Sequence, residues 1–162
     1  MIPAFLELGG KDPLIVTATA DLEKATDAAL RGSVLSTGQA CQSIERVYVA
    51  QAIADPFLAA LVKGAEKVEL TYPDPAKGHL GPFIFPAQAA KVQAQIDEAV
   101  AMGAKPLIDP ANFPADDGGA YLAPQVLVNV RDQFQPAAIG QAQVNQYYIG
   151  LQLFNHDHGF FQ

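Results

Sequence analysis

Short apolar segments alternate with amphipathic segments along this chain, and this alternation constrains its fold more than any other feature. The run LIVT at residues 14–17 follows turn-forming residues at 9–13 and predicts a buried strand. Residues 47–49, 107–108 and 126–130 predict further strands, and they lack the polar alternation of half-exposed strands. We therefore predict an α/β fold with three layers, in which a mostly parallel sheet has helices on both faces.

The amphipathic segments predict three helices. The first begins at Thr19 or Asp21, either of which can cap its N-terminus, and Gly32 either ends this helix or is tolerated inside it. The second is expected over residues 53–68 and the third over residues 87–102. A chain of 162 residues with this pattern fits one compact domain.

Residues 133–162 differ in composition from the rest of the chain. They contain no Lys or Arg, one acid (Asp157) and seven of the fourteen glutamines. We therefore divide the chain into residues 1–132, which carry the α/β pattern, and a divergent Gln-rich segment, 133–162. A foreign extension, a rearranged end and a partly disordered tail all agree with this composition.

Charge and cysteine content narrow the classes of partner and location. The chain has 17 acidic and 10 basic residues and a net charge of -7, so we expect no nucleic-acid or anionic-membrane partner. One cysteine cannot form an internal disulfide, and we find no signal-peptide pattern, so we expect a cytoplasmic protein. No apolar run approaches the roughly 18 to 20 residues that cross a bilayer, so we expect no membrane span.

Two short stretches contain residues suited to catalysis. Glu7 lies between leucines and before Gly9-Gly10, where a carboxylate can become a base with a raised pKa. Cys41 follows Gly38, and a turn there can expose its backbone N–H as an oxyanion donor. The residues alone leave a plainer reading open, in which Cys41 is a small buried apolar side chain and Glu7 is solvated.

Other polar clusters are weaker candidates. The stretch His156-Asp157-His158 has the minimum number of ligands for a metal, and a solvated tail explains it better. His79 and the pair Asp116-Asp117 are expected to be polar groups of turns or loops. We therefore predict no metal site.

The order of several motifs resembles a known family. LELGGKDP at 6–13, ADLEKATDAAL at 20–30 and GQACQSIERVYV at 38–49 are similar to the catalytic domain of the NAD(P)-dependent aldehyde dehydrogenase superfamily. DPFLAALVKGA at 55–65 and YLAPQVLVNV at 121–130 follow in the same order. The Glu and Cys motifs at this separation are the specific part of the resemblance.

The resemblance implies a role for four residues. Cys41 would be the nucleophile that forms a thiohemiacetal with an aldehyde and then a thioester, and Glu7 the general base. Leu8 and Gly9 would lie beside the nicotinamide of NAD or NADP. Having Glu7 implies hydrolysis to a free carboxylic acid rather than transfer to coenzyme A.

The sequence also departs from the family pattern. The family's dinucleotide-binding domain and oxyanion asparagine would precede Met1, and its EExFGP segment is replaced by RDQFQPAAIGQAQ at 131–143. We therefore expect a truncated catalytic domain, with exposed sheet edges that favour self-association or a partner chain. Two functions follow: oxidation of an aldehyde to a carboxylic acid, or an inactive scaffold or interaction module.

Overall fold

The structure is a computed structural model, and it describes residues 3–4, 12–74, 76–113, 120–130 and 144–149. Strands, α-helices and short 3-10 helices (η) follow one another as β1 (Asp12–Val16), α1 (Leu22–Val34), η1 (Leu35–Gly38), β2 (Ile44–Ala50), η2 (Gln51–Ile53), α2 (Ala54–Ala65), α3 (Pro86–Ala101), β3 (Lys105–Pro106), η3 (Pro110–Asn112), β4 (Val126–Val128) and β5 (Val144–Ile149). Residues 5–11, which include most of the Glu motif at 6–13, lie outside these ranges.

The five described strands form one sheet in the order β1-β2-β5-β4-β3. β1 and β2 pair in parallel, whereas β5 is antiparallel to both β2 and β4, and β3 is antiparallel to β4. β1, β2 and β4 therefore run in one direction. The α/β class is confirmed, but the sheet is mixed in its pairing because β5, from the Gln-rich segment, lies between two strands that point the same way.

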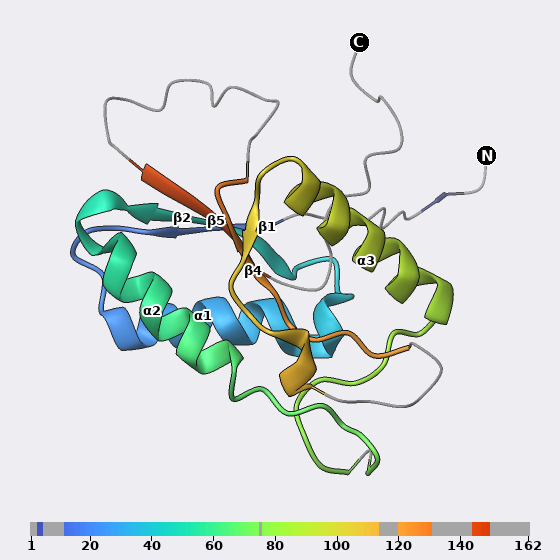
Figure 1. The fold of residues 1–162 in the computed structure, drawn as a ribbon. Helices are drawn as coiled ribbons and strands as arrows, with labels where there is room; N and C mark the ends of the chain where they lie inside the picture. The colour runs from blue at the N-terminus through green and yellow to red at the C-terminus, as the bar shows by residue number, and fades with distance from the viewer. Residues whose placement is uncertain (1–2, 5–11, 75, 114–119, 131–143, 150–162) are drawn as a thin grey trace.

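Helices cover both faces of this sheet, as predicted. α1 and α2 pack side by side on one face, and α3 lies on the other (Figure 1). Neighbouring residues of β4 face opposite layers: Val126 packs in the core that holds Phe57 and Leu61 of α2, and Leu127 packs in the core that holds Val92 of α3. This alternation is the period-2 geometry of a strand buried on both faces.

Local chemistry accounts for the helix boundaries. The side chain of Asp21, one of the two predicted caps, accepts a hydrogen bond from the backbone N–H of Lys24 at 3.0 Å. Pro86 begins α3, where its missing N–H costs nothing, and Gly103 follows that helix with a φ of 104°. Gly32 lies inside α1, at a position where the Ile44 side chain occupies the space of a β-carbon.

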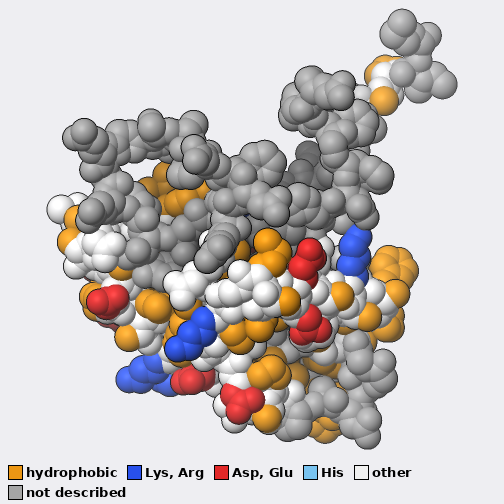
Figure 2. Space-filling model, turned by 45° about the horizontal axis from the view of Figure 1, so that its top comes forward, with side chains coloured by type: hydrophobic (Ala, Val, Ile, Leu, Met, Phe, Trp, Pro, Cys, Tyr) orange, Lys and Arg blue, Asp and Glu red, His pale blue; other side chains and the backbone are white. Residues whose placement is uncertain are grey.

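Two features of the described residues bear on the expected partners. No helix among them is long and apolar enough to cross a membrane. On the face drawn in Figure 2, the described acidic and basic side chains are interspersed with apolar ones and do not gather into a basic patch.

The cores described above predict unequal effects for the same substitution at two phenylalanines. Phe57 is fully buried and Phe85 is 70% exposed. Phe57→Ala should lower the free energy of unfolding by about 3–5 kcal/mol, because it leaves a cavity between α2 and the sheet. Phe85→Ala should change it by less than about 0.5 kcal/mol. Urea unfolding followed by circular dichroism measures both, and equal losses would contradict this placement of the core.

Candidate active site

Cys41 lies in the turn that joins η1 to β2, three residues before β2 begins. Its side chain is exposed, which excludes the reading of Cys41 as a small buried apolar residue. The Sγ–H donates a hydrogen bond to the side-chain oxygen of the adjacent Gln42, with a sulfur-to-oxygen distance of 3.0 Å. The thiol is therefore accessible to a carbonyl compound from solvent.

The backbone before Cys41 has an uncommon conformation. Ser36, Thr37 and Gly38 have φ values of 53°, 58° and 65°, so three consecutive residues are left-handed. A left-handed residue other than glycine costs about 1–3 kcal/mol and persists only where its surroundings hold it. Such a turn before the thiol indicates a locally constrained segment.

Two backbone hydrogen bonds close the chain around Cys41. The N–H of Gln39 donates to the carbonyl of Ser36, and the N–H of Ser43 donates to the carbonyl of Ala40, both at 3.1 Å. Neither bond uses the N–H of Cys41.

The cysteine turn is also attached to a distant segment that leads into α3. The side-chain oxygen of Gln39 accepts a hydrogen bond from the backbone N–H of Ile84 at 3.1 Å. Thr37 is buried, and its Oγ1 lies 3.3 Å from the point where a β-carbon of Gly81 would stand. The sequence singles out Gln39 only as a neighbour of Cys41, because a partner 45 positions away leaves no local signal.

Ser43 adds a second polar group next to the thiol in the sequence. Its hydroxyl is buried, and it has no hydrogen-bond partner among the residues that the structure describes. A buried hydroxyl without a partner costs about 1–3 kcal/mol.

The other three predicted site residues, Glu7, Leu8 and Gly9, lie outside the described residues. The structure therefore does not describe where they lie relative to Cys41. It does show where the chain from the Glu motif enters the fold, because β1 begins at Asp12, and Asp12 is paired with Ile44, the first residue of β2.

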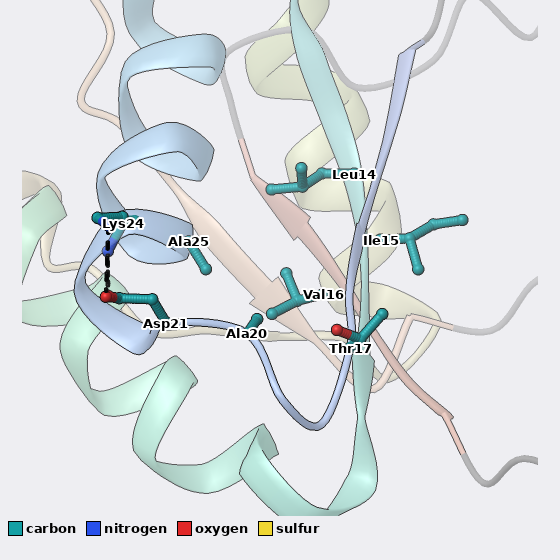
Figure 3. A pocket seen from close by; sticks show the side chains of 8 residues that line it. All are labelled: Leu14, Ile15, Val16, Thr17, Ala20, Asp21, Lys24 and Ala25. Atoms are coloured by element: carbon teal, nitrogen blue, oxygen red, sulfur yellow. Dashed lines mark hydrogen bonds and ion pairs between the residues drawn. The ribbon is translucent and has the colours of Figure 1, made fainter.

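Neither of the two hollows described for this surface lies at Cys41. The first runs between β1 and the start of α1, where Leu14, Val16, Ala20 and Ala25 form an apolar lining and Ile15 projects from the other side of the strand (Figure 3). The second lies beside Val68, Leu70 and Phe113.

The first hollow does not offer the anion site that a dinucleotide needs. A pyrophosphate is bound by a glycine-rich turn at a helix N-terminus, and the helix beside the first hollow already has the Asp21 carboxylate at that position. Among the described residues, no three His, Cys, Asp or Glu side chains form a group suited to a metal. His79 accepts a hydrogen bond from the N–H of Glu69 at 3.4 Å, the loop role expected for it. The residues Asp116, Asp117 and 156–158 lie outside the described ranges.

Comparison with family models identifies the family of this chain. The model of the aldehyde dehydrogenase family matches residues 1–138. The chain belongs to the aldehyde dehydrogenase family. The resemblance of the Glu and Cys motifs to that superfamily is therefore confirmed.

Individual relatives agree with this assignment. The chain is 43% identical over 129 residues to 4,4'-diapolycopene aldehyde oxidase of Methylomonas sp, a match that covers 80% of this chain and 23% of that protein. It is 39% identical over 130 residues to betaine aldehyde dehydrogenase of Sinorhizobium fredii, covering 79% and 26%. The crystal structure of lactaldehyde dehydrogenase from Escherichia coli superposes with a TM-score of 0.70 at 34% identity, covering 77% and 26%. The chain thus spans about a quarter of the length of the relatives it matches.

The left-handed turn predicts opposite tolerance of two substitutions at Ser36. Ser36 is exposed, so a substitution there tests backbone conformation rather than packing. Ser36→Val should lower the free energy of unfolding by about 1–2 kcal/mol, because a β-branched residue is strained at positive φ. Ser36→Asn should change it by less than about 0.5 kcal/mol, because asparagine tolerates this region. Urea denaturation compares the two, and equal tolerance of Val and Asn would rule out the left-handed conformation.

Proposed function

We propose that this chain carries the covalent part of the oxidation of an aldehyde to a carboxylic acid, with Cys41 as nucleophile and Glu7 as general base. The observation that carries the proposal is the parallel pairing of β1 with β2, in which Asp12 stands opposite Ile44. Family membership supports the reaction class. The exposed thiol in a constrained turn supports the choice of nucleophile.

The strand pairing limits how far apart the two motifs can be. Adjacent strands lie about 4.8 Å apart, and five residues of chain span at most about 17 Å, so the α-carbon of Glu7 lies within that reach of Asp12. Ile44 is the first residue of the neighbouring strand β2, and Cys41 lies three residues before it. Cys41 and the residues before Asp12 therefore lead into the same end of the two strands. The two motifs therefore enter the sheet side by side, although 34 positions separate them in the sequence.

The chemistry assigned to these residues begins at the carbonyl carbon. The Cys41 sulfur, after loss of its proton, forms a bond to that carbon, and the carbonyl oxygen receives the electron pair opposite the Cys41 N–H. After oxidation of the adduct to a thioester, Glu7 takes a proton from water as the water oxygen bonds to the carbonyl carbon. The carbon–sulfur bond then breaks, and a carboxylic acid leaves.

The hydride acceptor is proposed from the family alone. The resemblance assigns NAD or NADP, with Leu8 and Gly9 beside the nicotinamide, but the described residues do not form a dinucleotide site. The relatives are named for different aldehydes, so we propose only an aldehyde as the substrate class. We also propose a cytoplasmic location, in keeping with a single cysteine in the chain.

A second candidate function is that of an interaction module which binds another copy of this chain. β1 is an edge strand of the described sheet, and its Ile15 is 69% exposed. An exposed apolar edge strand favours pairing between chains. Light scattering after gel filtration tests this candidate. The apparent mass should rise with concentration, Ile15→Lys should suppress the rise, and the comparably exposed Ile84→Lys should not.

The proposed nucleophile predicts a covalent adduct that can be weighed. Incubation of the purified chain with p-nitrophenyl acetate should add one acetyl group at Cys41, because an activated ester presents the same carbonyl carbon without the need for oxidation. Intact-mass spectrometry and peptide mapping detect it. Cys41→Ala should abolish the adduct, and Ser43→Ala should retain it. An acetyl group found elsewhere, with Cys41 unmodified, would refute the assignment.

The proposed base predicts a separate effect on the second half of the reaction. Glu7→Gln should slow release of the acetyl group by about 10²–10⁴-fold, because water then lacks its proton acceptor. Acetyl-Cys41 should therefore accumulate, and quenched samples taken over time show its decay by mass. Glu23→Gln, on the exposed surface of α1, serves as the matched control. Unchanged decay in Glu7→Gln would remove Glu7 from this role.

A further inference from the structure

We propose that Gln39 is a positioning residue, whose side chain fixes the Cys41 turn against the segment that leads into α3. This inference rests on the proposed function, because positioning matters only if Cys41 attacks a carbonyl. The hydrogen bond from the Ile84 N–H to the Gln39 side-chain oxygen, at 3.1 Å, is the observation that supports it. Gln39 is separated from Cys41 by Ala40 alone, so a shift of Gln39 is transmitted along the backbone to the thiol.

The donor side of this bond follows a segment that is held by burial and by backbone hydrogen bonds. Leu80 and Phe83 are buried, with 0% and 3% exposure. The N–H of Phe83 donates to the carbonyl of Ala120 at 2.8 Å, and the N–H of Thr71 donates to the carbonyl of Leu80 at 2.9 Å. The Ile84 N–H therefore follows directly from an anchored segment, and it can serve as a fixed point for the cysteine turn.

The acceptor side belongs to a strained part of the fold. Gln39 directly follows three left-handed residues, and Thr37 is held closely against Gly81. The turn is thus bound to residues 81–84 at two points, through Thr37 by packing and through Gln39 by a directed hydrogen bond. Packing against Gly81 limits the space that Thr37 can occupy, whereas the hydrogen bond fixes the orientation of the Gln39 side chain. Removing the bond should leave the turn folded but with a wider range of positions for Cys41.

Loss of position affects two reactions of the same thiol differently. Acylation requires the carbonyl carbon at Sγ and its oxygen opposite the Cys41 N–H, so it is sensitive to displacement on the order of 1 Å. Alkylation by iodoacetamide requires only an accessible, deprotonated sulfur. The ratio of the two rates therefore separates positioning from accessibility.

The test compares the full chain with three variants. Gln39→Met removes the acceptor at nearly constant side-chain length, and Gln39→Glu keeps an acceptor oxygen. Gln93→Met is the matched control, because the Gln93 side chain is exposed and donates to Asp97 within α3. Each protein is treated with p-nitrophenyl acetate and, separately, with iodoacetamide. The rates at Cys41 are read by mass, and thermal unfolding is followed in parallel.

Gln39→Met should lower the acylation rate by about tenfold and change the alkylation rate by less than about twofold. Gln39→Glu should recover most of the acylation rate, and Gln93→Met should match the unaltered chain. Full acylation by Gln39→Met overturns the inference, as does a parallel fall of both rates or a failure of Gln39→Glu to recover. If the unaltered chain acquires no acetyl group at Cys41, the proposed function itself fails, and the inference fails with it. The outcomes that overturn only the role of Gln39 leave the proposed function intact.

Discussion

The parallel pairing of β1 with β2 is the constraint on which the rest of this structure depends. Parallel strands present the same ends to the same edge of a sheet, so the chain segments before Asp12 and before Ile44 must enter together. The core on the α1 and α2 side holds this pair through Val16, Val47 and Val49. A register shift of one residue would turn these valines toward the opposite face, which makes the register costly to change.

The turn before β2 shows how local strain and long-range contacts combine. Ser36 and Thr37 occupy a backbone region that their side chains disfavour. Gln39, two residues after Thr37, accepts a hydrogen bond from the backbone N–H of Ile84. The same loop carries the exposed thiol. Strain of this kind is found where a fold has to present a group in one orientation, and it is offset by the packed segments around it.

Much of this architecture could be predicted from the sequence because it depends on local signals. The β-branched run 14–17 predicted the strand β1, but the buried position expected for it was wrong: β1 is an edge strand that begins at Asp12, and only Val16 in it is buried. Asp21 caps α1 and Gly103 follows α3, as expected. The second helix is shorter than predicted, at Ala54–Ala65, because the chain first forms the 3-10 turn η2 and then leaves the helix at Glu66. The candidate site residues could be named because the Glu and Cys motifs, at their separation in the sequence, are specific to the family.

The features that sequence did not predict depend on contacts between distant positions. β5 lies in a segment whose glutamine-rich composition concealed a strand, and its place between β2 and β4 is decided by pairing that no local pattern encodes. The partner of Gln39 is likewise 45 residues away. Both cases show tertiary contacts overriding composition.

The central claim is that the fold, through these contacts, makes Cys41 a better nucleophile toward a carbonyl than the same residue in an unfolded chain. The most direct measurement is the acetylation rate of Cys41 by p-nitrophenyl acetate at neutral pH, in the folded protein and in the same protein unfolded in urea. The folded chain should react at least about tenfold faster, because only the fold can hold the thiol and the proposed oxyanion donor in one arrangement. An equal or slower rate in the folded chain would contradict it.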